Sequence, residues 1–496
     1  MLNRLFSVKP VEPAPHVDAG EPVEGSLQGE ATLRRTLTAR HLILLGMGAV
    51  IGAGIFVITG QAAALHAGPA IMLSFVLAGF ACALAGLCYA EFASMMPVSG
   101  SAYSYSYATL GEAVAWFIGW CLVLEYLFAS GAVAVAWSGY MVSFLTSTLG
   151  LPFPAELASA PLAWVDGGFV RTDSLVNLPA IMIVAAISGL CYVGITQSAF
   201  VNAIIVAIKV AVIAAFIGFG AQYVDPANWT PFIPENTGPG QFGMDGVFRA
   251  ATLVFFAYIG FDAVSTAAGE ARNPQRDMPI GILGSLLLCT IIYIAVCAVL
   301  TGMTHYSLLN TAKPVATALE EVMKADPAAS VGWLKTAVEL GAIAGLSSVI
   351  LVMLMAQPRI FYSMSRDGLL PGLFGRIHGR FRTPYVGTLL VGATACLLAG
   401  FLPLSMLGEL VSMGTLLAFA TVCVGVFVLR FRRPDLARPF RVPLFWLICP
   451  LGALACLFLF LQSFREHWMV FVGWTVLGQL IYFGYGYRNS KLNRQA

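Results

Sequence analysis

Three ionisable side chains stand deep inside long apolar runs of this sequence. Lys209 is the clearest, because the run VNAIIVAIKVAVIAAFIGFG gives it nearly two helical turns of apolar residues on each side. Glu125 and Asp262 lie in comparable runs. If these runs are membrane helices, ionisable groups at such a depth are costly and usually functional. Their types indicate proton binding, ion binding or gating rather than covalent catalysis.

Each of these residues leaves two interpretations open. Burial disfavours the charged form of a lysine, so Lys209 could exchange a proton, or it could be a permanent cation with a structural role. Glu125 and Asp262 could act in gating or ion coupling. They could instead be structural partners for backbone N–H groups that an irregular helix leaves free.

Glycines interrupt the first long apolar run, which reads GMGAVIGAGIFVITG. Glycine is a poor helix former, so the cluster predicts a break in the helix. A close helix contact is the alternative, because Gly48 and Gly52 form a G-x-x-x-G pair. A dinucleotide fingerprint is excluded, because Ile51 stands where its third glycine would be. A second run, VFFAYIGFDAVS, is interrupted by Gly260 and Asp262, which favours the break.

Two corresponding interruptions predict an inverted repeat, spans one to five against spans six to ten, with a substrate between two broken helices. The N–H groups that begin each second half-helix can hold a carboxylate, and the carbonyls that end each first half can hold an ammonium group. A zwitterionic amino acid presents both groups. The pattern therefore indicates an amino acid as the substrate.

The composition requires a lipid solvent for these elements. The chain has 496 residues, of which 58% are hydrophobic and 10% charged, and its mean hydropathy is +0.82. Ordinary globular domains carry about 25% charged residues, so the outside of this molecule must also be apolar. The net charge of +2 does not indicate a nucleic-acid partner. The ten cysteines lie in or beside apolar runs and indicate neither a disulfide framework nor a metal site.

A membrane-spanning helix needs about 20 mostly apolar residues, and the sequence predicts twelve such spans. They cover residues 41–65, 70–96, 113–145, 176–193, 199–221, 246–265, 279–302, 333–357, 385–402, 405–430, 443–463 and 467–487.

The basic residues predict the orientation of these spans. With the N-terminus in the cytoplasm, twenty of the 27 lysines and arginines fall on the cytoplasmic side and five on the outside, with Lys209 and Arg249 within spans. Cytoplasmic loops carry the excess of Lys and Arg. We therefore expect a multi-pass protein of the cytoplasmic (inner) membrane with both termini in the cytoplasm.

No loop is long enough for a soluble catalytic domain, and the sequence has neither a G-x-x-x-x-G-K-[ST] loop nor an H-E-x-x-H motif. We expect no enzyme activity, no cofactor and no bound metal. Residues 1–40 are polar and lack the apolar region of a signal peptide, so they are predicted to be a cytoplasmic tail.

Several long motifs carry a family resemblance that covers nearly all of residues 38–464. They are GAVIGAGIFVITG, LCYAEFASMMPVSGSAYSYSYATLGE, FIGWCLVLEY, FFAYIGFDAVSTAAGEARNPQRDMPIGI and PRIFYSMSRDGLLP. In these motifs the chain resembles the amino acid-polyamine-organocation family of permeases, specifically bacterial members similar to cationic amino acid transporters.

The resemblance implies an all-α integral membrane protein with twelve transmembrane helices and a LeuT-like five-plus-five inverted repeat. The transport core would be 41–430, with repeats 41–221 and 246–430 in which helices one and six are broken. Residues 431–487 would form two accessory spans and 488–496 a cytoplasmic tail.

The resemblance also assigns the site. The substrate carboxylate would bind the backbone around Ile51, Gly52, Ala53, Gly54 and Ile55.

The substrate amino group would bind the backbone around Phe256, Ala257 and Ile259. Phe256 also matches an aromatic residue that closes over the substrate as an extracellular gate. Lys209 would occupy the place of a sodium ion in sodium-coupled relatives, reaching toward the broken first helix. A proton would then be the coupling ion.

Met353 favours a small neutral L-amino acid such as alanine, transported by proton symport. It stands where cationic members have a small residue, so it shortens the pocket. A long cationic side chain would also need a buried counter-charge. Glu125 keeps arginine or lysine transport or exchange as the alternative. A membrane amino acid sensor is an alternative of another class, and a channel is a third.

Overall fold

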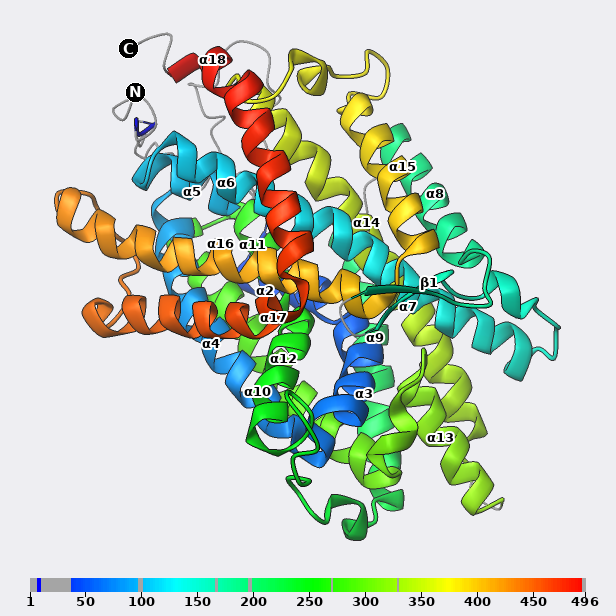
Figure 1. Cartoon of the computed structure of the whole chain (residues 1–496). Helices are drawn as coiled ribbons and strands as arrows, with labels where there is room; N and C mark the ends of the chain where they lie inside the picture. The colour runs from blue at the N-terminus through cyan, green and yellow to red at the C-terminus, as the bar shows by residue number, and fades with distance from the viewer. Residues whose placement is uncertain are drawn as a thin grey trace.

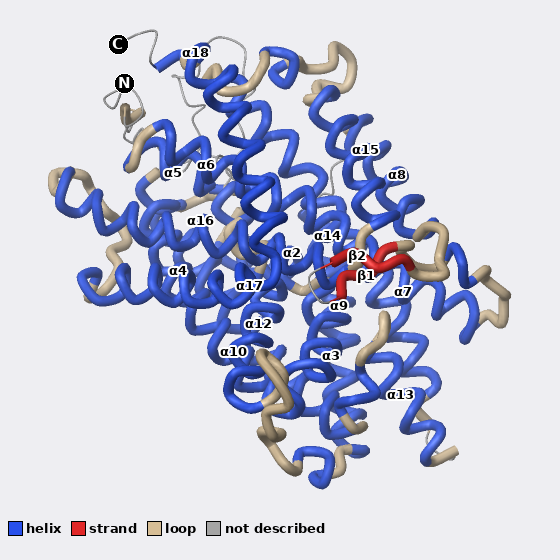
Figure 2. Tube along the Cα trace, in the orientation of Figure 1, coloured by secondary structure: helices blue, strands red, loops and turns tan. Residues whose placement is uncertain are grey.

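The computed structural model describes residues 7–9, 37–96, 101–165, 168–194, 199–268, 271–327 and 330–492. Most of the predicted N-terminal tail, four residues of one family motif (97–100) and residues 493–496 lie outside this description. The described chain is almost entirely helical, and one short two-stranded hairpin is its only sheet (Figure 2).

The first half of the chain contains both helices of regular α geometry and short 3₁₀ or π segments, labelled η. They are α2 Ala39–Val50, η1 Gly54–Ile58, α3 Thr59–Ala62, η2 Ala63–Ala67, η3 Gly68–Ala70, α4 Ile71–Met95, α5 Ser101–Thr109, α6 Glu112–Val123, η4 Leu124–Phe128, α7 Ala129–Ser143, η5 Phe144–Thr148, η6 Ala155–Leu157, α8 Leu178–Val193 and α9 Ala199–Gly220. Strands β1 Leu162–Val165 and β2 Gly168–Arg171 pair antiparallel.

The second half continues in the same manner. Its elements are η7 Ala221–Tyr223, η8 Pro226–Trp229, α10 Gly243–Phe255, η9 Phe256–Tyr258, α11 Ala263–Thr266, α12 Pro274–Met303, η11 Tyr306–Leu309, α13 Pro314–Ala325, α14 Gly332–Arg366, η12 Gly372–Gly375, α15 Tyr385–Phe401, α16 Leu404–Arg432, α17 Phe445–Ile481, η13 Tyr482–Gly486 and α18 Tyr487–Asn489.

Seven helical stretches among the described residues are long and apolar enough to cross a membrane, and three shorter apolar helices accompany them. Two of the seven, Gly54–Met95 and Phe445–Asn489, contain 42 and 45 residues, more than twice what a bilayer requires. Each contains a bend. The first turns at Gly68, with φ +57°, and the second leaves helical geometry at His467, with φ −116° and ψ 19°.

The outside of the molecule is apolar, as the composition requires. Leu287 on α12, Leu397 on α15 and Leu480 on α17 are 63%, 62% and 67% exposed. A water-soluble protein would bury side chains of this size, because each contributes about 1.5–3 kcal/mol on burial. These positions are therefore suited to contact with lipid.

The helices pack in pairs that are distant in sequence (Figure 1). Helix α4 lies along α12 and α10, α2 lies along α12 and α9, and α14 lies along α7 and α9. By contrast, helix α16 packs along α17, which directly follows it in the chain. The irregular segment after α2 is buried beside α9 and α14. The irregular segment after α10 is also buried, and it packs against α4 and α16.

Residues 7–9 and α18, the described parts nearest the two termini, lie near one another on one side of the molecule, and α13 lies on the opposite side (Figure 1). At the side of the termini, Arg430 on α16 binds Glu91 on α4 over 2.6 Å. There too Lys9 contacts Asp367, the residue after α14, over 2.8 Å. These ion pairs join elements from both halves of the chain.

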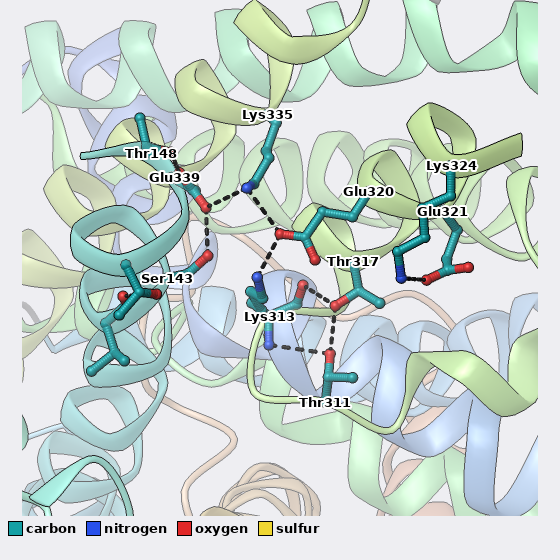
Figure 3. Close-up of polar contacts among 12 residues, drawn as sticks. Ser143, Thr148, Thr311, Lys313, Thr317, Glu320, Glu321, Lys324, Lys335 and Glu339 are labelled. Atoms are coloured by element: carbon teal, nitrogen blue, oxygen red, sulfur yellow. Dashed lines mark hydrogen bonds and ion pairs between the residues drawn. The ribbon is translucent and has the colours of Figure 1, made fainter. Parts of the chain in front are cut away.

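A second polar network holds α13 in place (Figure 3). Glu320 on α13 accepts from Lys313 over 2.6 Å and contacts Lys335 of α14 over 2.9 Å. Glu339, one helical turn after Lys335, is fully buried and accepts from Ser143 over 2.5 Å. The network therefore connects α13 to α14 and to the end of α7.

Candidate functional site

The first irregular segment follows α2. The helix ends at Val50, Ile51 has an extended backbone with φ −74° and ψ 94°, and helical structure of π type resumes at Gly54. Residues 51–55 are all buried. The first N–H groups of a helix have no partner within it, so this segment presents N–H donors inside the protein.

The second irregular segment follows α10. Helix α10 ends at Phe255, a single 3₁₀ turn follows, and Ile259 is extended with φ −61° and ψ 133°. Gly260 then adopts φ +111°, a conformation that side chains with a Cβ atom rarely reach. Helix α11 begins at Ala263. The glycine at this position is therefore required by the backbone.

The two irregular segments touch each other. A Cβ atom added to Gly54 would lie 2.3 Å from the Cα atom of Ala257, and one added to Gly260 would lie 3.0 Å from the carbonyl oxygen of Ala49. Only glycine allows this approach at position 54. Residues from the first and sixth predicted spans thus form one continuous backbone surface.

Tyr293 of α12 lies near one backbone carbonyl at each of the two irregular segments. Its hydroxyl oxygen lies 2.8 Å from the carbonyl oxygen of Val50 and 3.0 Å from that of Ala257. A hydroxyl group has one proton to donate, so it serves one carbonyl at a time. This leaves at least one of the two acceptors with spare capacity for another donor.

Lys209 of α9 is fully buried and lies under the first irregular segment. Its ammonium nitrogen donates to the carbonyl oxygens of Gly48 over 2.9 Å and Ile51 over 3.0 Å. It makes no ion pair with a carboxylate of the described chain. Its aliphatic stem packs on α14, where a Cβ atom at Gly345 would lie 2.7 Å from the Lys209 Cε atom.

Helix α14 forms a wall beside the first segment. A Cβ atom at Gly52 would lie 3.4 Å from the Val349 side chain. Met353 is one helical turn further along α14, so it lies on the same helix face, and it is 2% exposed.

Phe256 is also buried, and its ring faces α16. A Cβ atom at Gly408 would lie 3.7 Å from the Phe256 ring and 3.3 Å from Ile58. The ring of Phe256 therefore lies between the backbone of its own irregular segment and α16, close to the end of η1.

Glu125 and Asp262 are neighbours, although they are 137 positions apart in the sequence. One Asp262 oxygen accepts from the Tyr126 hydroxyl over 2.8 Å and from the Ser101 hydroxyl over 3.4 Å. The other Asp262 oxygen and both Glu125 oxygens have no hydrogen-bond partner within the described chain. The nearby Thr415 hydroxyl is directed to the carbonyl oxygen of Val411. Glu125 is thus a fully buried carboxyl group with spare acceptors.

Sequence reasoning did not identify Tyr293, Tyr126 or the buried ion pair between Arg249 and Glu409, whose atoms are 2.7 Å apart. Nothing in the sequence distinguishes these two tyrosines from the many other aromatic residues of the apolar runs. The ion pair did leave a signal, because two residues of opposite charge stand within separate predicted spans, 246–265 and 405–430.

Comparisons with known proteins identify the family of this chain. The family model described as amino acid permease matches residues 37–484. The methylthioribose transporter of Bacillus subtilis is 46% identical over 494 residues, which cover 99% of this chain and 100% of that protein. The branched-chain amino acid permease BcaP of the same organism is 47% identical, over 94% of this chain and 96% of that protein.

A plant protein and a solved structure extend the comparison. Cationic amino acid transporter 2, vacuolar, of Arabidopsis thaliana is 40% identical over 81% of this chain and 61% of that protein. The crystal structure of MhsT in complex with L-phenylalanine superposes with a TM-score of 0.59 at 15% identity, covering 87% of this chain and all of MhsT. At this identity the likeness concerns the fold, and it agrees with the helical LeuT-like class that the sequence predicts.

The family assignment rests on the match along most of the chain and on relatives that align from end to end. It confirms the resemblance seen in the sequence motifs. The chain therefore belongs to the amino acid permeases of the amino acid-polyamine-organocation family, and it is a multi-pass membrane transport protein and not an enzyme.

Proposed function

We propose that the chain is a secondary active permease that carries small to medium neutral L-amino acids, such as alanine, together with a proton. The observation that supports this most strongly is the contact between the two irregular segments at Gly54 and Ala257, beside the buried ammonium group of Lys209. Helix ends of opposite polarity meet there, and an amino acid carries the two complementary charges.

In this proposal the substrate carboxylate binds the N–H groups of residues 51–55. Its ammonium group binds the carbonyl oxygens of Phe256, Ala257 and Ile259. The Ala257 oxygen already lies near the Tyr293 hydroxyl, but a carbonyl oxygen has two lone pairs and accepts a second donor. Phe256 closes the site on the side of α13.

Met353 supports a neutral substrate. It is buried on the α14 face that borders Gly52, so it occupies space that a long side chain would need. The name of the 47% identical relative, a branched-chain amino acid permease, also points to neutral aliphatic substrates. A cationic substrate remains the second candidate, because Glu125 has acceptors without a partner.

A proton is the proposed coupling ion and Lys209 its carrier. A sodium ion about 4 Å from a protonated lysine would be repelled by about 4 kcal/mol at an effective dielectric of 20. The two carbonyl oxygens that Lys209 contacts hold its charged form, so loss of its proton would release the last turn of α2. Glu125 and Asp262 are proposed to take part in coupling or gating, because one proton on this pair would remove one of two adjacent charges.

For topology we propose twelve spans, with α2 and η1–η2 as the broken first span and α10 with α11 as the broken sixth. The bend at His467 divides the stretch Phe445–Asn489 into the two accessory spans. The core is residues 41–430, and both termini lie on the cytoplasmic side of the bacterial inner membrane. The α13 side is then the outer side.

Uptake by the purified protein in proteoliposomes tests this function. An inward proton gradient should drive accumulation of radiolabelled alanine or a branched-chain amino acid above equilibrium. A channel would only equilibrate the substrate, and a sensor would bind it without flux. Better accumulation of arginine or lysine, or of methylthioribose, would overturn the neutral amino acid assignment.

A further inference from the structure

Arg249 of α10 is a buried cation held by side chains from two other helices. It is 3% exposed, and one guanidinium nitrogen lies 2.7 Å from each carboxylate oxygen of Glu409 on α16. The same nitrogen contacts Glu466 of α17, and the other donates to the Ser463 hydroxyl over 3.1 Å. Three helices therefore meet at one guanidinium group.

The position of this cluster relates it to the proposed gate. Arg249 on α10 and Phe256, the first residue after α10, are seven positions apart, so they lie on about the same face of that helix. Glu409 directly follows Gly408, whose small size leaves room for the Phe256 ring and Ile58. Helix α10 is thus joined to α16 at two adjacent points, one ionic and one aromatic.

The accessory helix α17 changes direction at the cluster. His467, where α17 leaves helical geometry, has its Nδ1 atom 3.1 Å from a Glu409 oxygen. Its ring stacks on Trp164 of β1, with ring centroids 5.2 Å apart. The bend between the two halves of α17 therefore contacts the same carboxylate that holds Arg249.

Glu409, Glu466 and His467 also have the spacing of a metal site. The guanidinium group of Arg249 already occupies both Glu409 oxygens and one Glu466 oxygen, and a metal ion would have to displace that resident cation. The contacts favour a mechanical role for the cluster over metal binding.

We propose that Arg249 is a positioning residue of the outer gate. Its ion pair with Glu409 holds α10 against α16 and keeps Phe256 in the closed position, and the pair separates when the site opens to the outside. Glu466 and Ser463 make the accessory helix α17 a part of the gate. The mechanism rests on the proposed permease function, but the closed contact can be tested without any substrate.

The test measures how fast a cysteine at position 58 reacts with a membrane-impermeant maleimide. Ile58 is 5% exposed and lies beside Gly408. We call the ion pair between Arg249 and Glu409 the latch. Ile58→Cys should react slowly when the latch is intact. The background comes from the parent protein, whose ten cysteines are all free and, apart from half-buried Cys396, buried. Combining Arg249→Leu with Glu409→Leu removes both charges and should raise the rate at least about tenfold, since a minor open state becomes readily populated.

Further variants test whether the Arg249–Glu409 ion pair controls opening of the gate or only stabilises the fold. Arg249→Lys keeps the charge, but a single ammonium nitrogen cannot hold the two glutamates and also donate to the Ser463 hydroxyl, which the second guanidinium nitrogen contacts. Its labelling rate should therefore be intermediate. Exchanging the charges, Arg249→Glu with Glu409→Arg in a Glu466→Gln background, should restore slow labelling. Arg433→Ala removes an exposed ion pair on the side of the termini and should leave the rate unchanged.

Two outcomes would overturn the latch. One is labelling of the folded double variant within about twofold of the parent, the size of effect expected for a surface pair. The other is a charge exchange that labels as fast as the double variant. If the unmodified protein transports no amino acid, the proposed function fails, whereas the labelling result still decides the latch.

Discussion

The ammonium nitrogen of Lys209 donates to the carbonyl oxygen of Gly48 over 2.9 Å and to that of Ile51 over 3.0 Å. Gly48 lies in the last turn of α2 and Ile51 directly follows that helix. The charge of one side chain on α9 is therefore joined to the backbone that borders the proposed substrate site. Hydrogen bonds from a charged group contribute about 1.5–3 kcal/mol each. The protonation of Lys209 is therefore linked to the position of this segment.

Lys209→Ala should abolish uptake driven by a pH gradient while the protein still folds. Lys209→Arg should also fail, because a guanidinium group does not lose its proton. Lys335→Ala, which removes a lysine from the α13 network, is the matched control and should retain the pH response. Uptake that needs sodium and ignores an imposed pH gradient would contradict the mechanism.

Gly54→Ala should block transport, because its new Cβ atom would lie 2.3 Å from the Ala257 backbone. The two irregular segments would have to separate, and such overpacking costs about 1–3 kcal/mol. Initial uptake rates and thermal stability measure the two effects. Gly189→Ala, on α8 with no atom within 4 Å of the added Cβ, should leave both unchanged or slightly raise stability. Normal transport by Gly54→Ala would show that this contact is not needed.

Met353→Ser should widen the range of substrates toward longer and cationic side chains, because it removes a buried side chain from the wall beside Gly52. Competition of unlabelled amino acids with radiolabelled alanine measures the range. The control is Met355→Ser, since Met355 is only partly buried on a different part of α14. An unchanged competition profile for Met353→Ser would remove this residue from the pocket.

Tyr126→Phe should alter the pH dependence of transport, because it removes the 2.8 Å hydrogen bond to Asp262. Without this donor the charged carboxylate loses about 1.5–3 kcal/mol of stabilisation. Glu125→Gln should change the same profile, since it removes one of the two neighbouring carboxyl groups. Glu321→Gln on α13 is the control. If both buried substitutions leave the profile of uptake against pH unchanged, the pair has no part in coupling.

Glu320→Gln should lower thermal stability near neutral pH but not in acid. Partial burial opposes ionisation of Glu320, but hydrogen bonds and charge from Lys313 and Lys335 outweigh it and hold its pKa below the ordinary value. A lowered pKa contributes stability above the unfolded value of about 4.3, and this contribution is lost as the pH falls through the folded value.

Melting curves of the two proteins should therefore converge between about pH 5 and pH 3. The difference near neutral pH should not exceed about 1 kcal/mol, because the ion pairs are partly exposed. Glu321→Gln, whose partner Lys324 is largely exposed, should show little difference at any pH. A difference that persists in acid would mean that Glu320 stabilises α13 by packing and not by charge.

The sequence by itself determined the lipid environment, the apolar runs, the two glycine interruptions and the family. These are local properties, because composition, run length and glycine content act within one segment of the chain. Position 209 was identifiable for the same reason, since a lysine amid apolar residues is conspicuous without knowledge of its partners. The predictions for Phe256 and Met353 likewise came from motif positions and not from contacts.

Only the tertiary structure decided which distant residues meet. The contact of Gly54 with Ala257, the position of Tyr293 between two carbonyls, and the proximity of Glu125 to Asp262 each depend on which helix faces pack together. In a membrane chain most helix faces are apolar, so hydropathy does not distinguish the face that contacts protein from the face that contacts lipid. The pairing of Arg249 with Glu409 shows the same limit, because the two charges could be counted in the sequence but only close packing of α10 on α16 joins them.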